Sequence, residues 1–420
     1  RSQVIALASA AERVNTSTVG LGFVAAADLR IDAGVVRFWL EAHRHSGDPS
    51  DLERARRGAD ELLAGLPEAA PEDSGQVFNY GLHAGWAGVM WLLEQVHRHT
   101  GEARFRDGAL RLLDQIHDLA QDDGDGGVHW DETNELFYGN AGLGLVLLWA
   151  AEDLDHAPSL ELATRAGRWL LGTAEARPGG LTWAWSPNEP DLVMPNFSHG
   201  TAGVSYFLAR LYEVTGDGAF LDAALAGAGH LTTIAETGGG RYCLVFHHED
   251  RGDRTGEDRY YLGLCHGPVG TTRLFEQLYR TTGDAEWRRW VDHGARAIVD
   301  SGIPEAETPG FWNNVSQCCG SAGVIEFFLD RYRQSGDADD LAFARRVADN
   351  LVERASSERD GLKWVQAEHR RRPEQLEAQV GFMQGASGIA TALLHLDAVV
   401  RGLEVEPLRF VDDPWGEPGP

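Results

Sequence analysis

The sequence predicts an all-α protein, an (α/α)6 barrel (toroid) in which six inner helices are enclosed by six outer helices. Three observations predict it: a Gly-x-x-Gly motif recurs six times, an apolar run follows each motif, and an amphipathic segment follows the run. A repeat of this kind cannot bury its apolar face alone, so neighbouring repeats must pack together. We expect a closed ring rather than an open solenoid, because solenoid repeats are more uniform and have capped ends.

The Gly-x-x-Gly motif marks the start of each expected inner helix. Examples are "GLHAGWAGVMWLLEQV" and "QCCGSAGVIEFFLDRY", in which apolar residues continue around the helix, as is typical of a buried helix. Successive first glycines lie 54, 61, 67, 53 and 65 residues apart. They are Gly85, Gly139, Gly200, Gly267, Gly320 and Gly385.

The remainder of each unit supplies an outer helix and a short extended piece. Four apolar runs end in "HTGE", "VTGD", "TTGD" or "QSGD", where glycine suits the left-handed position after a helix. An amphipathic segment such as "EWRRWVDHGARAIVDSG" follows and should keep one face in water. A Gly-led stretch with an aromatic residue, such as "GGVHW" or "GGLTW", then leads toward the next motif.

The repeats divide the chain into three parts. Residues 50–400 form the expected barrel, residues 1–49 an N-terminal segment that packs on it, and residues 401–420 a C-terminal tail. The chain begins at Arg1 rather than Met, so we expect a trimmed N-terminus or a longer polypeptide, with fusion to kinase and lyase domains left open.

Composition narrows the classes of partner. The net charge is −27, from 37 basic and 64 acidic residues, which argues against nucleic acid and against an anionic membrane surface. We find no apolar run of about 18 residues, so no integral membrane segment is expected. Four cysteines in 420 residues do not make a disulfide framework. They indicate a reducing, cytoplasmic compartment with thiols used for chemistry or metal binding.

Chemistry-bearing residues precede three of the motifs. The third, fourth and fifth motifs bring His199, Cys265, His266, Cys318 and Cys319 to one end of the barrel, because all inner helices run in the same direction. Thiolates, with imidazole as an alternative ligand, favour zinc. Cys265, Cys318 and Cys319 would supply three metal ligands. Spacing alone does not decide between these three and a set that includes His266.

The whole pattern resembles the lanthionine synthetase cyclases, the LanC-like family. The resemblance rests on the sixfold repeat and on "SHGTAG", "LCHGPVG" and "QCCGSAG", and it covers residues 50–400. It implies that Cys265 and Cys318 are zinc ligands and that His199 is the catalytic histidine. Cys319 stands where the family usually has a histidine ligand, which makes this a Cys-Cys-Gly variant with three thiolates for Zn²⁺.

The resemblance also assigns expectations to the second and fourth units. Glu135 stands where the family often has an aspartate, four residues before the first glycine, and would orient or tune His199. His266 is a second candidate for proton transfer. An arginine that the family usually has before the zinc cysteine is replaced by Tyr261, with Arg259 as a nearby substitute.

The implied activity is lanthipeptide cyclisation, a step of ribosomal-peptide modification (RiPP biosynthesis). The family adds a peptide cysteine thiol to dehydroalanine or dehydrobutyrine of the same peptide and forms a thioether ring. The implied partners are a dehydrated precursor peptide, with leader and core, and a dehydratase or kinase/lyase enzyme. A thiol with a pKa of about 8.5 is a poor nucleophile at neutral pH, and zinc would ionise it. His199 would then protonate the resulting enolate.

The third thiolate suggests a hypothesis about reactivity. Zn²⁺ with three thiolates carries a net charge of −1, whereas two thiolates and a neutral imidazole give zero. More electron donation should leave a substrate thiolate more nucleophilic. Cys319 would therefore make the zinc site more reactive toward its substrate and less selective.

Several alternatives remain open. A LanC-like protein could bind thiols or glutathione, or add glutathione to its substrate. An α/α-toroid glycosidase would need paired carboxylates across a cleft, and a prenyltransferase-like toroid would use Asp, Cys and His around zinc. Aromatic residues, including Trp183, Trp185 and Trp312, are expected to line the cleft.

Overall fold

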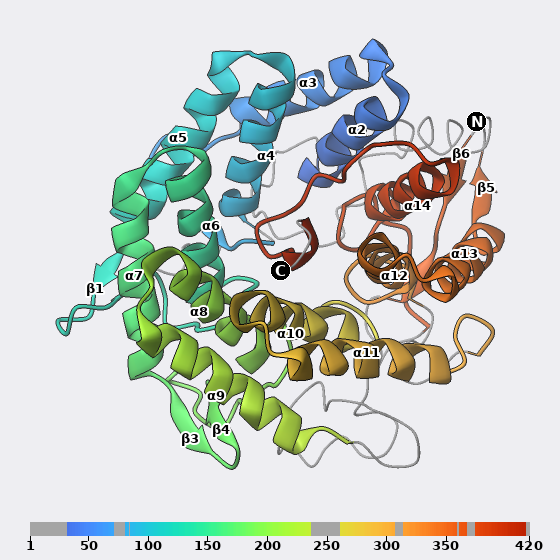
Figure 1. Cartoon of the computed structure of the whole chain (residues 1–420). Helices are drawn as coiled ribbons and strands as arrows, with labels where there is room; N and C mark the ends of the chain where they lie inside the picture. Colours follow the sequence, from blue (N-terminus) through green and yellow to red (C-terminus); the bar gives the residue numbers. More distant parts are fainter. Residues whose placement is uncertain are drawn as a thin grey trace.

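Paired helices form two concentric layers in the computed structural model, which describes residues 32–70, 80–83, 85–236, 261–306, 314–358, 361–367 and 374–416. Each inner helix except α14 is followed along the chain by an outer helix that packs against it (Figure 1). The inner helices are α2 (Ala33–Ser46), α4 (Trp86–Thr100), α6 (Asn140–Asp153), α8 (Thr201–Thr215), α10 (Pro268–Thr282), α12 (Ser321–Ser335) and α14 (Ala386–Arg401). The outer helices are α3 (Pro49–Ala64), α5 (Ala103–Asp118), α7 (Ala157–Gly172), α9 (Gly218–Ile234), α11 (Ala285–Asp300) and α13 (Ala338–Glu353).

The predicted α/α barrel is confirmed, with one inner helix more than the motifs mark. Helix α2 packs against α14 on one side and α4 on the other, and so completes the ring. It begins at Ala33, after a capping bond from the amide of Gly34 to Asp32, and carries no Gly-x-x-Gly motif. The expected N-terminal segment 1–49 therefore contains a member of the ring, which differs from the boundary at residue 50.

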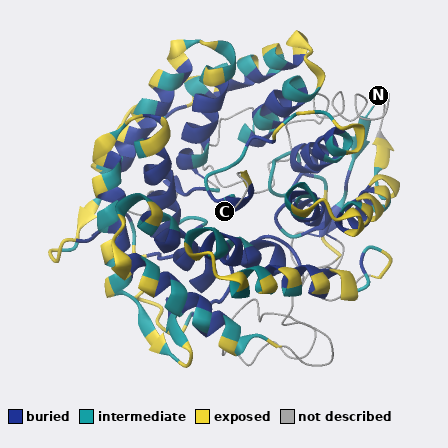
Figure 2. Cartoon of the chain, viewed as in Figure 1, coloured by how far each residue is buried: buried dark blue, intermediate teal, exposed yellow. Residues whose placement is uncertain are grey.

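Burial follows the two layers. In α6 every residue from Asn140 to Ala150 is buried, whereas each outer helix has one solvent-exposed face (Figure 2). This matches the expectation from the apolar runs, because a helix surrounded by others can be apolar around its whole circumference.

The second glycine of each motif is required by close packing. A Cβ atom on Gly142 would lie 2.0 Å from the carbonyl oxygen of Leu136, and one on Gly270 would lie 1.8 Å from that of Leu264. The same relation, second glycine against the residue three positions before the first glycine, holds in all six motifs. The motif thus lets the chain before the helix fold back onto the first helical turn.

The predicted helix stops are confirmed. Gly101, Gly216, Gly283 and Gly336 follow inner helices with φ of 73°, 69°, 70° and 71°, in the left-handed region that glycine tolerates. A capping aspartate then starts the next outer helix at Asp217, Asp284 and Asp337, each by accepting a backbone N–H.

Short antiparallel hairpins connect outer helices to the following motifs. They are β1 (Gln121–Asp122) with β2 (Val128–His129), β3 (Glu175–Arg177) with β4 (Gly180–Thr182), β5 (Ser356–Glu358) with β6 (Gly361–Lys363), and β7 (Gln366–Ala367) with β8 (Leu376–Glu377). The stretches "GGVHW", "GGLTW" and "DGLKW" lead into or contain a strand of such a hairpin. The expected extended pieces "GGRYC" and "GFWNN" fall almost wholly outside the described residues.

The tryptophans that end these hairpins are core residues. The indole N–H of Trp183 donates to the carbonyl oxygen of Leu170 at 2.7 Å, and Trp130 and Trp364 make equivalent bonds to Ile116 and Leu351. Each closes the C-terminal end of an outer helix. The expectation that Trp183 lines the cleft was therefore wrong, since its side chain is 1% exposed. Trp312 lies outside the described residues.

The C-terminal segment after α14 returns to the centre of the ring, where Figure 1 places the C-terminal end. It ends in a short 3-10 helix, η3 (Pro414–Gly416), that contacts α10. Asp412 is buried and its carboxylate contacts His83 at 3.0 Å and Arg273 at 3.0 Å. The segment thus ties together the first and fourth units from inside. No helix among the described residues is long and apolar enough to span a membrane.

Candidate active site

A series of backbone hydrogen bonds joins the six motifs at the N-terminal end of the inner helices, here called the rim. Each bond runs from the amide two positions before one first glycine (position −2) to the carbonyl oxygen at the same position of the next motif. The distances are 2.9 to 3.2 Å. The residues joined in order are His83, Phe137, Ser198, Cys265, Cys318 and Met383.

The predicted site cysteines and histidines fall into two sets, according to whether they lie one or two positions before the first glycine of their motif. Cys265 and Cys318 share position −2, and the amide of Cys265 donates directly to the carbonyl oxygen of Cys318 at 3.1 Å. Cys319 occupies position −1, the position of His199 and His266 in the two preceding motifs. The three cysteines are therefore not equivalent: two come from matching positions and one from the position where its neighbours have histidine.

Side chains four positions before the first glycine hold the position −1 backbone. Asn196 accepts the amide of His199 at 2.8 Å, and Ser316 accepts that of Cys319 at 3.2 Å. Glu135 accepts the amide of the equivalent residue in the second motif, Tyr138. In the second, third and fifth motifs these polar acceptors fix the turn that presents the position −1 side chain. Asn196 and Ser316 were not among the predicted site residues.

The structure brings the three predicted metal ligands together. The Sγ atoms of Cys265, Cys318 and Cys319 lie within 4.8 Å of one another, and those of Cys265 and Cys319 are 3.1 Å apart. Sulfur ligands at about 2.3 Å from a tetrahedral zinc ion would lie about 3.8 Å apart. Cys265 and Cys318 are buried and Cys319 is partly exposed, so the cluster has one accessible side. The donor set and its close grouping fit zinc.

The electrostatics of the cluster also favour a cation. Hydrogen bonds from Cys265 and Cys318 lower the pKa of the Cys319 thiol. Hydrogen bonds to Cys318 and Cys319, together with burial, raise the pKa of Cys265. The cluster thus stabilises one thiolate, on Cys319, and disfavours ionisation of Cys265, because like charges in a desolvated site repel each other. A divalent cation would remove that repulsion.

Beside the cluster lies a hydrogen-bonded histidine and carboxylate. His199 Nδ1 is 2.5 Å from Oε2 of Glu135, whose side chain is 1% exposed while that of His199 is 23% exposed. The other oxygen of Glu135 accepts the amide of Gly139 at 2.8 Å. Glu135 is therefore held by its own helix start and fixes the imidazole by one nitrogen, which leaves Nε2 for exchange with a substrate.

Aromatic rings surround His199. Its ring lies 5.4 Å from that of His266 and 6.0 Å from that of Tyr138, nearly parallel to the latter. His266 in turn lies 5.3 Å from the ring of buried Tyr261. The expected proton-transfer candidate His266 is thus a direct neighbour of His199. The expected substitute Arg259 lies outside the described residues.

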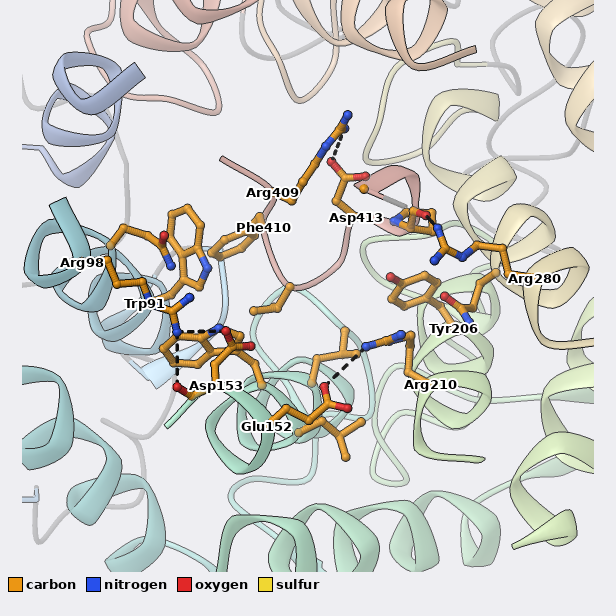
Figure 3. A pocket seen from close by; sticks show the side chains of 18 residues that line it. Trp91, Arg98, Glu152, Asp153, Tyr206, Arg210, Arg280, Arg409, Phe410 and Asp413 are labelled. Carbon is orange, nitrogen blue, oxygen red and sulfur yellow. Dashed lines mark hydrogen bonds and ion pairs between the residues drawn. The ribbon is translucent and has the colours of Figure 1, made fainter. Parts of the chain in front are cut away.

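A cavity of about 310 Å³ lies between the inner helices α4, α6, α8 and α10 and the C-terminal segment (Figure 3). Its lining residues extend from the middle of these helices toward their C-terminal ends, away from the rim. Six of its charged side chains form ion pairs, Arg98 with Asp153, Arg210 with Glu152 and Arg409 with Asp413. A further one, Arg280, donates to the carbonyl oxygen of Pro414. None of the predicted site residues lines it, so this cavity is separate from the rim chemistry.

The fold and the rim together define an α/α barrel with a cluster of three thiols, of a kind that could hold a metal ion, beside a histidine–glutamate pair. A sequence model of the family described as "Lanthionine synthetase C-like protein" matches residues 32–228 and 305–401. The chain belongs to this family. The match includes Glu135, His199, Cys318 and Cys319, whereas Cys265 and His266 lie between the two matched stretches.

Solved structures of other proteins share this architecture. Nisin cyclase superimposes with a TM-score of 0.61 at 14% identity, over 90% of each chain. A sugar epimerase from a ruminal bacterium has a TM-score of 0.52 at 15% identity, over 78% of this chain and 88% of the other. D-mannose isomerase has a TM-score of 0.51 at 12% identity, over 77% of this chain and 87% of the other. At such identities these likenesses establish the fold alone.

Proposed function

We propose that this protein is a zinc-dependent lanthionine synthetase that adds cysteine thiols of a dehydrated ribosomal peptide to dehydroalanine or dehydrobutyrine. The observation that supports it most is the position of the His199–Glu135 pair beside the three-thiol cluster on one rim. Membership of the lanthionine synthetase C-like family agrees with this proposal. Because cyclases and sugar epimerases share this fold, the proposal rests on the side chains at the rim rather than on the fold.

The cluster would activate the nucleophile. Cys265, Cys318 and Cys319 would hold zinc, which when bound supplies a Lewis acid beside which an incoming thiol loses its proton at neutral pH. The ligand count agrees with a catalytic site, since three protein ligands leave one tetrahedral position open. The partly exposed side of Cys319 is where the substrate would approach.

His199 would move the proton. Its Nδ1 is engaged by Glu135, so Nε2 can accept the thiol proton and return it to the α-carbon after the sulfur–carbon bond has formed. Glu135 stabilises the imidazolium that exists between these two steps. The reaction adds S–H across a carbon–carbon double bond, so one thiol disappears and the mass does not change.

A second candidate is addition of glutathione to the dehydro residue by the same residues. The metal cluster favours this as much as the cyclase, because an open zinc position takes any thiol that reaches it. The outcome separates the two: ring formation leaves the peptide mass unchanged, whereas glutathione addition increases it.

The proposal is tested by incubating the zinc-loaded protein with a panel of dehydrated precursor peptides, with and without glutathione. We expect free peptide thiols to be lost without a change in mass. A His199→Asn variant should lose this activity while it keeps its zinc. Unchanged thiols across the panel, with zinc present, would contradict cyclase activity, and a mass increase with glutathione would support the second candidate.

A further inference from the structure

The Cys319 sulfur has a hydrogen-bond donor from the next motif. The side-chain Nε2 of Gln384 lies 3.7 Å from Sγ of Cys319, within the longer range of hydrogen bonds to sulfur. Gln384 is the position −1 residue of the sixth motif, one unit beyond Cys319. The contact therefore joins neighbouring position −1 residues at the rim.

A second glutamine fixes which way the Gln384 amide faces. Buried Gln366 on β7 donates its side-chain N–H groups to Gln384, to Oε1 at 3.2 Å and to the backbone carbonyl oxygen. The oxygen of Gln366 is itself occupied, because it accepts the amide of Val315 at 3.1 Å. Each amide in this series has a defined orientation, and the last one presents only N–H to the sulfur.

We propose that Gln384 is a positioning residue that specifies a thiolate, rather than an imidazole, as the third metal ligand. This inference rests on the proposed zinc site. A ligating thiolate accepts hydrogen bonds, so the fixed N–H of Gln384 matches Cys319. A ligating histidine donates its second N–H and needs an acceptor at this place. Gln384 locked as a donor would oppose it.

Cys319 and Gln384 thus form a matched pair, and each should depend on the other. Loss of a partner that supports a ligand typically weakens metal binding by about 10- to 100-fold. Cys319→His alone should bind zinc more weakly, because two donors face each other. Gln384→Glu alone should also weaken binding, because a carboxylate faces a thiolate. The double variant restores a donor–acceptor pair, His to Glu.

The test is a double-mutant cycle on the full chain. Zinc affinity is measured by competition with a chromophoric chelator for wild type, Cys319→His, Gln384→Glu and the double variant. Binding of Co²⁺ is recorded in parallel, since the sulfur-to-metal charge-transfer band reports the number of thiolates. We expect each single variant to lose about 10-fold or more in affinity, and the double variant to recover most of that loss.

A control removes the trivial explanation that a charged residue disturbs the fold. Gln115 is another buried glutamine with both ends of its amide engaged, by Tyr80 and by the carbonyl oxygen of Pro67, and it lies on α5 rather than at the rim. Gln115→Glu should leave zinc affinity unchanged. Gln384→Leu, which introduces no charge, should still weaken zinc binding and shift the charge-transfer band.

The outcomes separate this inference from the proposed function. Wild-type protein that takes up no zinc would overturn the metal site and, with it, both proposals. Wild-type protein that binds zinc, with losses that simply add in the double variant, would overturn the pairing of Cys319 and Gln384 and leave the cyclase proposal standing. Unchanged affinity in Gln384→Leu would also overturn the pairing.

Discussion

His199 and Glu135 come from consecutive units and meet through a 2.5 Å contact between Nδ1 and Oε2. The carboxylate is almost fully buried and also accepts two backbone amides of its own turn, those of Tyr138 and Gly139. Such an arrangement fixes the ring orientation and the tautomer of a histidine that acts in acid–base chemistry. Glu135 makes these contacts at the position where the family often has the shorter aspartate.

Glu135→Gln should therefore impair the reaction without loss of metal. The amide would present a donor to Nδ1, so the neutral ring would carry its proton on Nε2 and could not accept the thiol proton there. We expect the cyclisation rate to fall by about 10²- to 10⁴-fold, with zinc content unchanged. Glu132→Gln, on the exposed side of the same loop, is the matched control. Equal rates for wild type and Glu135→Gln would show that the pair does not act in proton transfer.

Cys319→His tests the effect of the third thiolate on reactivity. In excess zinc the variant should remain metal-loaded, with the net charge of the centre raised from −1 to zero. The substrate thiolate should become less nucleophilic, so we expect slower cyclisation or a different distribution of rings. The measurement is the time course of thiol loss together with fragmentation of the product. Zinc loss even in excess metal, or an unchanged rate and ring pattern, would refute the hypothesis.

A buried histidine joins α2 to the rest of the ring and makes stability depend on pH. His395 on α14 contacts Glu326 of α12 at 2.7 Å and Glu41 of α2 at 3.3 Å. Although burial lowers it, these two carboxylates raise the pKa of His395 to about 9 from 6.5. The stabilisation is fully present below pH 6.5 and is lost as the pH rises through 9.

Urea unfolding at pH 6.5 and pH 10 measures this contribution. We expect the free energy of unfolding of wild type to fall by about 3 kcal/mol over this range. His395→Gln should be less stable at pH 6.5 and should lose most of the pH dependence. A variant with the same pH dependence as wild type would show that another group is responsible.

Asp412 should matter for stability although it lies in a C-terminal segment. Burial raises its pKa, but Arg273 and His83 outweigh this and hold the pKa of Asp412 well below its usual range. Asp412→Asn leaves Arg273 without its buried countercharge, so we expect a loss of about 3–5 kcal/mol in the free energy of unfolding. Glu404→Gln, exposed in the same segment, should have little effect. Similar stabilities for the two variants would show that the contacts of Asp412 do not stabilise the barrel.

Much of the fold could be predicted because the barrel repeats a physical constraint. Each second glycine must let a carbonyl oxygen approach closely, so the motif recurs wherever an inner helix starts. Helix α2 escaped prediction because it has an aspartate cap in place of that motif. The prediction for Trp183 was wrong because the sequence near a rim loop does not show which way an aromatic side chain points. Here the indole points to the C-terminal end of an outer helix and donates a hydrogen bond to it.

The clustering of the three cysteines was predictable for a related reason. Cys265, Cys318 and Cys319 could be placed at one rim because the direction of every inner helix followed from the motif. The supporting residues could not, because Gln366 lies on a hairpin strand whose contact with Gln384 depends on loop packing. Position −4 is polar in the second, third and fifth motifs, as at Asn196, and glycine in the others, so the role of these side chains as amide acceptors follows only from the structure.

Zinc dependence of the cyclisation is measured by removing and restoring the metal in a single assay. Protein stripped with a chelator is incubated with a dehydrated precursor peptide, zinc is then added, and free peptide thiols and peptide mass are followed throughout. We expect no loss of thiols before zinc is added, and loss of one thiol per ring at constant mass afterwards, with Cys265→Ala inactive in both phases. Thiols lost equally fast without zinc, or retained after one zinc per chain has bound, would contradict zinc-dependent cyclisation.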